Sequence, residues 1–259
     1  MKVNVISILW GKKYDKDDVN RLYSMIKRNT SLSIDFILFS NNDLPGLNKE
    51  ISKLPEPAIM TDIYSETLNY RKEAGLCDNN LGGLNGQRVF FFDLDVLITG
   101  DLDELFCYPK DDLFYIINDW NTKGNHVGQA TCYSFVVGKL GFVKDFFEAN
   151  SNEVISEFGT ASQEYLSREV QKVYGELNFW PEKWFNSFKI HCLPVWFMRR
   201  FSVPNPPPSG TKVLAFHGHP DLNDALNGTW HDKKKHRWKI WKKLYKCCKP
   251  TLWIADYWN

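Results

Sequence analysis

The chain has 259 residues, a formal net charge of +1 and an apolar content of 43%. This length and apolar content are enough for one substantial hydrophobic core and a small additional segment. No window is apolar over the length of a membrane-spanning helix, and the first apolar stretch is too short for a signal peptide. The six cysteines are scattered without a Cys-x-x-Cys pair, which excludes a disulfide-rich scaffold and favours a cytoplasmic protein.

The N-terminal part of the chain predicts a strand–helix–strand unit. Residues 3–9 form an apolar run of strand length, residues 17–28 show apolar positions at helical spacing, and residues 33–40 again read as a strand. Two strands joined through a helix at such short range indicate parallel pairing. We therefore expect an α/β protein.

Further elements follow without an internal repeat, and the run from 89 to 98 has the strongest strand character. The remaining expected elements are helices near 64–75, 140–150 and 162–173, and strands at 114–117, 130–137 and 212–216.

Two carboxylates interrupt the apolar run 89–98, at Asp93 and Asp95. A buried carboxylate without a partner costs several kcal/mol, so this pair indicates a bound cation. On an extended chain both side chains would point to one face, with their Cα atoms about 6–7 Å apart. Both could reach one ion, or one could bind the ion while the other holds a group bound to it. Oxygen ligands suit Mg²⁺ or Mn²⁺, which keep positions open for substrate phosphates.

Other polar residues follow expected strands. Trp10, Gly11 and Tyr14 come after the first strand, and His217 and Gly218 come after the last one. Ligands of open α/β sheets bind beyond the carboxyl ends of the strands, so these residues are expected near the two aspartates. A neutral imidazole would complete an Asp/Asp/His set for Mn²⁺. A loop histidine without a ligand is the alternative reading of His217.

These pieces together resemble nucleotide-sugar glycosyltransferases of the A-type fold, close to bacterial relatives of glycogenin and of lipopolysaccharide glycosyltransferases. The resemblance implies a single Rossmann-like domain with a mainly parallel central sheet over residues 1–230, followed by a basic tail at 231–259. The matching stretches are Ile8-Leu9-Trp10-Gly11 with Tyr14, residues 88–105, Asn186-Ser187-Phe188-Lys189, Pro206-Pro207-Pro208 and Ala215-Phe216-His217-Gly218.

The resemblance also implies an activity. A sugar, expected to be a hexose on UDP, would pass to a saccharide or glycolipid acceptor in polysaccharide or lipopolysaccharide biosynthesis, with Mn²⁺ or Mg²⁺ stabilising the departing diphosphate. The implied metal ligands are Asp93, Asp95 and His217. The implied donor-binding residues are Trp10, Gly11, Tyr14, Lys72, Asp93, Leu94 and Gly218, and the implied catalytic residues are Asp93, Asp95, Gln163 and Lys189. For each lysine, a solvated surface charge is the alternative.

Three positions depart from the family pattern and leave the donor sugar open. Ser162 stands where relatives carry the aspartate of Gly-Asp-Gln, Cys132-Tyr133-Ser134 replaces an Asn-Ser pair, and His219 replaces a lysine. Two other functions therefore stay under consideration. One is a degenerate protein that binds nucleotide sugar or glycan without turnover. The other is a haloacid-dehalogenase-type phosphohydrolase, whose Asp-x-Asp-x-Val pattern also fits residues 93–96.

The tail contains a basic segment at residues 233–249, with nine Lys or Arg and no acidic residue. Trp238, Trp241 and Tyr245 fall at i, i+3 and i+7, which predicts a helix with an aromatic stripe. Such a helix suits the anionic inner face of a membrane, at about 1 kcal/mol per basic residue. Packing of the tryptophans on the catalytic domain is an equal alternative. Nucleic-acid binding is not expected, because no recognition module accompanies the basic run.

Overall fold

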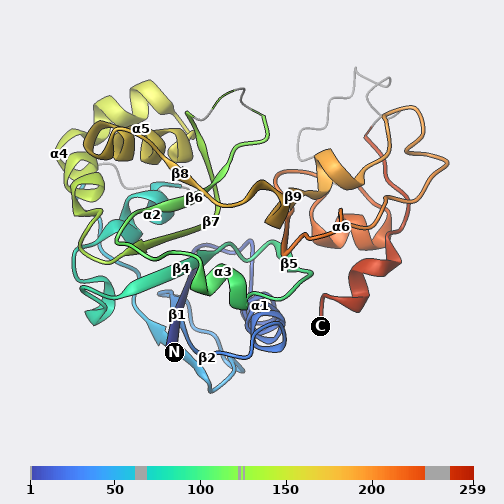
Figure 1. Cartoon of the computed structure of the whole chain (residues 1–259), viewed down its shortest axis with the longest axis horizontal. Coiled ribbons are helices and arrows are strands. Elements are labelled where there is room, and N and C mark those ends of the chain that lie inside the picture. The colour runs from blue at the N-terminus through green and yellow to red at the C-terminus, as the bar shows by residue number, and fades with distance from the viewer. Residues whose placement is uncertain (1, 62–68, 122–123, 125, 231–245) are drawn as a thin grey trace. The chain divides into compact units, whose positions relative to one another are not determined.

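A computed structural model describes residues 2–61, 69–121, 124, 126–230 and 246–259, and Figure 1 shows the chain. The chain divides into two compact units, and its passage from the first to the second between Leu94 and Asp95 falls inside the Asp-x-Asp pattern. Unit 1 comprises Met1–Tyr23, Ser31–Leu94 and Asp103–Trp180, and unit 2 comprises Ser24–Thr30, Asp95–Leu102 and Pro181–Asn259.

Unit 1 contains a seven-stranded sheet in the order β3-β2-β1-β4-β7-β6-β8. The pairs β1–β2, β2–β3, β1–β4 and β6–β8 are parallel, whereas β4–β7 and β6–β7 are antiparallel. The sheet is therefore mainly parallel, as expected. Its strands are β1 (Lys2–Ile8), β2 (Ser33–Phe39), β3 (Ile51–Leu54), β4 (Arg88–Phe92), β6 (Tyr115–Asn118), β7 (Gly128–Val136) and β8 (Asn178–Phe179).

The predicted strand–helix–strand unit is confirmed. Strand β1 leads into helix α1 (Lys16–Arg28), and β2 returns parallel to β1 in a register that joins Lys2 to Ser33. On α1, Val19, Leu22 and Ile26 are fully buried, as the helical spacing of apolar residues requires. The short strand β3 was not expected, because its four residues include exposed Ser52 and Lys53.

Four further helices and a large aromatic core complete unit 1. Helix α4 continues well past its expected end near Asn150, where the backbone departs from helical geometry (φ −132°, ψ 29°). In the core, Tyr70 stacks on Phe147 and Phe91 stacks on Tyr133, each with ring centroids 4.6 Å apart. The helices are α2 (Tyr70–Glu73), α3 (Asp103–Cys107), α4 (Gly141–Phe158) and α5 (Ser162–Tyr174), with short helical turns at Gly75–Cys77 and Leu81–Gly83.

The Asp-x-Asp segment does not continue one strand. Strand β4 ends at Phe92, and β5 (Val96–Ile98) begins in a different sheet, so residues 93–95 form a turn between the two. The extended-chain spacing expected for the carboxylates is therefore wrong. Apolar runs on both sides of a carboxylate pair are compatible with one strand or with two, and aspartate itself favours a turn.

Unit 2 contains a three-stranded sheet in the order β5-β10-β9. Strand β10 (Val213–Ala215) confirms the last expected strand in shorter form, pairing antiparallel with β5 and parallel with β9 (Phe185–Ser187). Helix α6 (Leu222–Asn227) was not expected, although the Asp221 carboxylate caps it by accepting from the Asp224 backbone N–H at 2.8 Å. Short helical turns lie at Glu182–Trp184, Phe188–Cys192 and Leu252–Asp256.

Most of the predicted basic helix falls on residues 231–245, which lie outside the described residues. The described end of the chain, 246–259, contains only a short helical turn and shows no basic helix. Thr251 and Ile254 are fully buried there, so this end packs within unit 2. Among the described residues, no helix has the length and apolar character needed to cross a membrane.

Candidate functional site

In unit 1, the carboxyl ends of β1 and β4 lie side by side. The Ser7 hydroxyl, near the end of β1, donates to the carbonyl of Phe92, the last residue of β4, at 2.5 Å. Trp10 and Gly11 follow β1 just as Asp93 follows β4. Gly11 has a φ of +65°, and its carbonyl accepts from the Asn42 amide at 2.9 Å. This edge of the sheet therefore combines an indole, an open glycine and a carboxylate, as the sequence predicted.

Lys72 reaches this edge from helix α2. Its ammonium lies 3.0 and 3.1 Å from the two carboxylate oxygens of Asp93, and its side chain is only 14% exposed. A lysine that bridges to a partly buried carboxylate is not a solvated surface charge. The structure thus places two predicted site residues, distant in sequence, in direct contact.

Glu73, which sequence reasoning missed, contacts the same lysine. Its Oε1 lies 3.2 Å from the Lys72 ammonium, whereas its Oε2 is buried without a hydrogen-bond partner. In sequence, Arg71-Lys72-Glu73 looks like a solvated run, so nothing in the pattern could have identified a glutamate that is 3% exposed. The lysine therefore pairs with two carboxylates at once.

Gln163 lies at the same edge, in the first turn of α5. Its side-chain oxygen accepts from the backbone N–H of Ala130 on β7, at 3.5 Å. The next residue on that strand, Thr131, accepts the backbone N–H of Asp93 at 2.9 Å. Gln163 and Asp93 thus bond to consecutive residues of one strand. Ser162, which stands where relatives of the resembled family carry an aspartate, is buried at the start of α5.

The unit 2 residues are held by their own sheet. The pairing of Ala215 with Val96 brings the backbone N–H of Phe216 to the carbonyl of Asp95, at 3.2 Å. His217 is the next residue along the chain. Asp95 therefore accepts a backbone hydrogen bond from the residue that precedes His217, although more than a hundred residues separate Asp95 from His217 in sequence.

Ser187, at the end of β9, orients the histidine. Its hydroxyl lies 2.7 Å from Nε2 of His217, and the serine is completely buried. The serine stands in one of the stretches that carried the family resemblance, but no role was predicted for it. A hydroxyl hydrogen-bonded to an imidazole in this way fixes the ring and its tautomer.

The other predicted residues have varied settings. In unit 2, Lys189 is exposed in the turn after β9, and Gly218 has a φ of +77° with open space where a Cβ would stand. In unit 1, Leu94 is 6% exposed and Tyr14 receives a hydrogen bond from the Lys13 ammonium. Glycine at position 218 permits close approach of a ligand to the backbone.

Two side chains of unit 2 are of the types that bind a divalent metal. A carboxylate and an imidazole, Asp95 and His217, suit Mn²⁺. Ser187, which bonds to Nε2 of His217, would orient the imidazole for such an ion. The carboxylate of Asp93 is neutralised by Lys72 in unit 1.

A second cluster in unit 2 serves the fold. Ligand atoms of His219, Asp221 and Asp224 lie within 4.8 Å of one another. Asp221 caps helix α6, however, and Asp224 accepts from the hydroxyl of Thr229 at 2.8 Å and contacts Nδ1 of His219 at 3.2 Å. Each member of the cluster thus has a structural partner.

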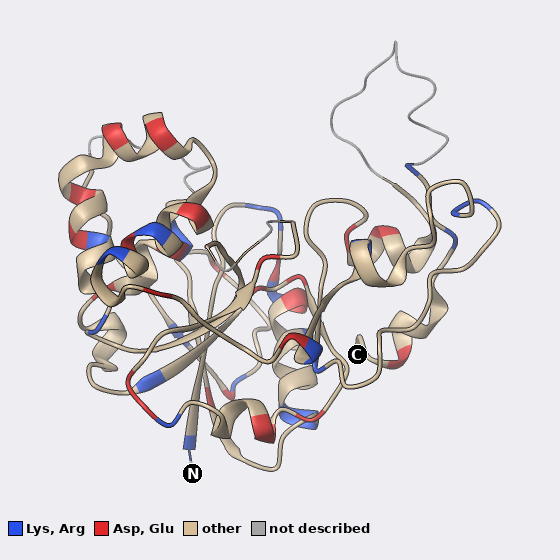
Figure 2. Ribbon diagram, turned by 45° about the horizontal axis from the view of Figure 1, so that its top comes forward, with Lys and Arg blue, Asp and Glu red and all other residues tan. Residues whose placement is uncertain are grey.

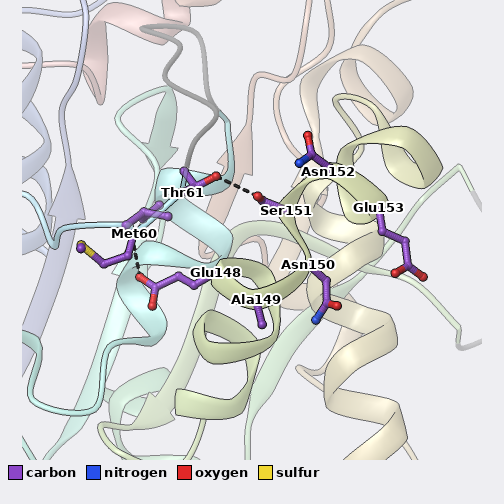
Figure 3. Close-up of a pocket in the computed structure, with 9 residues that line it drawn as sticks. Met60, Thr61, Glu148, Ala149, Asn150, Ser151, Asn152 and Glu153 are labelled. Atoms are coloured by element: carbon purple, nitrogen blue, oxygen red, sulfur yellow. Dashed lines mark hydrogen bonds between the residues drawn. The ribbon is translucent and has the colours of Figure 1, made fainter.

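A separate hollow of about 610 Å³ in unit 1 lies beside the break in α4, lined by residues 59–61 and 148–153. Figure 3 shows the bonds across it, from the Thr61 hydroxyl to Ser151 and from the Met60 N–H to Glu148, both at 2.8 Å. None of the predicted site residues lines this hollow.

No family model and no curated protein matches the chain. Among solved structures, the galactosyltransferase LgtC, in complex with donor and acceptor sugar analogs, is 12% identical, with a TM-score of 0.54 over 99% of this chain and 97% of LgtC. The glycosyltransferase GlyE of Streptococcus pneumoniae TIGR4 is 12% identical, with a TM-score of 0.54 over 86% of this chain and 56% of GlyE. The bifunctional glycosyltransferase WbbM is 15% identical, with a TM-score of 0.55 over 85% of this chain and 46% of WbbM. The resemblance to A-type glycosyltransferases is thus confirmed at the level of the fold.

Proposed function

We propose that this chain is a metal-dependent glycosyltransferase that moves a hexose from a nucleoside diphosphate, UDP in the first instance, to a saccharide or lipid-linked saccharide. The contact between Lys72 and Asp93 at the carboxyl edge of the sheet carries the proposal. It joins two residues singled out for donor binding, in a fold that LgtC, GlyE and WbbM share.

The reaction requires stabilisation of a diphosphate as it departs from the sugar. A bound Mn²⁺ or Mg²⁺ would supply Lewis-acid stabilisation of this charge. In unit 2, Asp95 and His217 would hold the ion, with Ser187 orienting the imidazole. In unit 1, Lys72 is a cation already paired with carboxylates, and a donor phosphate could share it by hydrogen bonding.

Donor recognition would fall to residues at the sheet edge. Trp10 offers an aromatic face for a base, Gly11 offers backbone that a ligand can approach, and Gln163 offers an amide for sugar hydroxyls. Tyr14 and Leu94 in unit 1 and Lys189 and Gly218 in unit 2 are the other residues that we propose for donor binding or catalysis. Ser162 supplies a short hydroxyl where relatives carry a carboxylate, so the donor sugar is expected to differ from theirs.

The proposal extends to the membrane. Nine basic residues in 233–249 would hold the protein at an anionic surface by charge. An acceptor carried on a lipid would then meet the enzyme at that surface.

A thermal-shift screen tests the proposal. UDP, GDP, CMP and their common sugars are each added with Mn²⁺ and with EDTA, and we expect a metal-dependent rise in Tm for the uridine compounds. A ligand at 100 times its Kd stabilises a protein by about 2.7 kcal/mol. No shift with any nucleotide contradicts the proposal.

Turnover separates the remaining functions. Release of UDP from the bound sugar donor is the expected result. Metal-dependent nucleotide binding without release would identify a degenerate binder. Phosphatase turnover in the absence of any nucleotide sugar would identify a phosphohydrolase.

A further inference from the structure

One loop of unit 2 projects from a closed and buried base. The backbone N–H of Asn205 donates to the carbonyl of Cys192 at 2.9 Å, and the Trp253 indole N–H donates to the carbonyl of Pro204 at 3.1 Å. Cys192 is fully buried and Leu193 nearly so. We name residues 193–204 the aromatic loop. Its ends are tied together, as in compact surface loops that present their own side chains.

The aromatic loop exposes large apolar side chains. Phe201 is 77% exposed, and Trp196 and Phe197 are 59% and 57% exposed. Val195, Met198 and Val203 are exposed as well, so nine consecutive residues contain six of the twelve exposed large apolar side chains in the described chain. Soluble proteins rarely leave such a concentration uncovered, and when they do it marks an interaction site.

Backbone turns hold these side chains outward. The N–H of Met198 donates to Val195, and the N–H groups of Phe201 and Ser202 both donate to Met198, at 2.8 to 2.9 Å. The Arg199 guanidinium donates to the carbonyl of Pro194 at 3.1 Å, which ties the middle of the loop to its start. Hydrogen bonds within the loop therefore hold its backbone in a conformation that exposes the apolar side chains.

The charge of unit 2 indicates what covers the loop. Residues 183–220 contain no Asp or Glu, and the loop itself contributes Arg199 and Arg200. Unit 2 has sixteen Lys or Arg, nine of them in the basic segment 233–249, and seven Asp or Glu, a net charge of +9. Unit 1 has sixteen Lys or Arg and twenty-four Asp or Glu, a net charge of −8. Figure 2 marks the described basic residues in blue and the acidic ones in red.

We propose that the aromatic loop inserts into the interface of an anionic lipid bilayer, with Trp196, Phe197 and Phe201 among the headgroups and upper acyl chains and Arg199 and Arg200 on the lipid phosphates. Tryptophan is enriched at this depth of membranes, and arginine pairs with phosphate in a bidentate manner. A symmetric contact between two copies of the loop would bring the four arginines together, which disfavours self-association. The proposal does not use the transferase chemistry, and the contacts it assigns to lipid come from the loop itself rather than from the basic segment 233–249.

Vesicle sedimentation of the full-length chain tests the proposal. We expect binding to vesicles of phosphatidylcholine with phosphatidylglycerol, and much weaker binding to phosphatidylcholine alone. The double variant Trp196→Ser/Phe201→Ser should bind the anionic vesicles about tenfold more weakly, because two apolar anchors are lost. Leu252→Ser is the matched control, since Leu252 is 72% exposed in the same unit but lies outside the loop, and it should bind like the wild type. Unchanged binding of the double variant overturns the proposal.

A depth measurement and an oligomer measurement complete the test. Lipids brominated on the acyl chain should quench part of the tryptophan fluorescence, and the milder variant Trp196→Phe should lose that part while keeping its Tm. Equal quenching in wild type and variant would place Trp196 outside the bilayer. If light scattering after gel filtration finds a dimer that the double variant loses, with vesicle binding unaltered, the loop is an interface between copies and the proposal fails.

Discussion

Units 1 and 2 differ in how much of their structure is buried sheet. Unit 1 builds on seven strands with a large aromatic core, and unit 2 on three strands of three residues each. The larger unit is acidic and the smaller is basic and exposes an aromatic loop. Each unit also holds candidate site residues of its own. The ion pair of Lys72 with Asp93 belongs to unit 1, and the candidate metal ligands Asp95 and His217 belong to unit 2.

The largest expected effect comes from removing the unit 2 carboxylate. Asp95→Ala should lower Mn²⁺-dependent nucleotide binding by about 100-fold or more, since a direct ligand is lost. The fold should persist, because β5 contacts β10 through backbone atoms. Calorimetric titration of nucleotide with and without Mn²⁺ measures the loss. Asp112→Ala, at a side chain that is 70% exposed in unit 1, is the control. Normal binding and turnover by Asp95→Ala would show that the metal assignment is wrong.

Breaking the unit 1 ion pair should cost stability as well as activity. In Lys72→Met, the carboxylates of Asp93 and Glu73 lose their shared cation, and we expect the free energy of unfolding to fall by about 2–3 kcal/mol. Urea unfolding measures this change. Adding Glu73→Gln to the variant should restore part of the loss, since a neutral amide is cheaper to bury than an unpaired charge.

The matched control is Lys139→Met, because Lys139 pairs with Asp112 at 3.5 Å on the surface. Its stability should stay within about 0.5 kcal/mol of the wild type. If Lys72→Met is as stable as the control, the ion pair of Lys72 with Asp93 does not contribute to the free energy of unfolding.

Loss of the Ser187 hydroxyl, which contacts His217, should have a smaller effect on metal binding. Ser187→Ala should weaken Mn²⁺ binding by about tenfold, because the imidazole loses the partner that fixes its tautomer. Ser187→Thr keeps the hydroxyl and should recover most of the affinity, and exposed Ser209→Ala should change nothing. Equal Mn²⁺ affinity in Ser187→Ala and wild type would separate the serine from metal binding.

The smallest expected effect concerns the basic segment. Lys235→Gln should weaken binding to anionic vesicles by about 1 kcal/mol, or about fivefold, and the difference should shrink in high salt. Lys110→Gln in unit 1 removes the same charge from the acidic unit and should leave vesicle binding as it was. Equal vesicle binding by Lys235→Gln and the wild type in low salt would argue against a membrane role for residues 233–249.

The sequence by itself determined the α/β class, the first parallel strand pair and the place of Asp93 after a buried strand. These depend on local patterns, namely apolar runs, helical spacing and a carboxylate that follows a strand. Gln163 and Lys72 could be nominated through family resemblance. The bonds that hold them, to Ala130 and Asp93, come from residues far away in the chain.

Only the tertiary structure decided the rest. It placed Asp93 and Asp95 in a turn between two sheets, buried Glu73 against Lys72 and brought the Ser187 hydroxyl to His217. It also left Trp196 and Phe197 of the aromatic loop exposed. Composition records which residues are apolar or charged. Burial and pairing depend on which distant segments pack together, and one local pattern is compatible with several such packings.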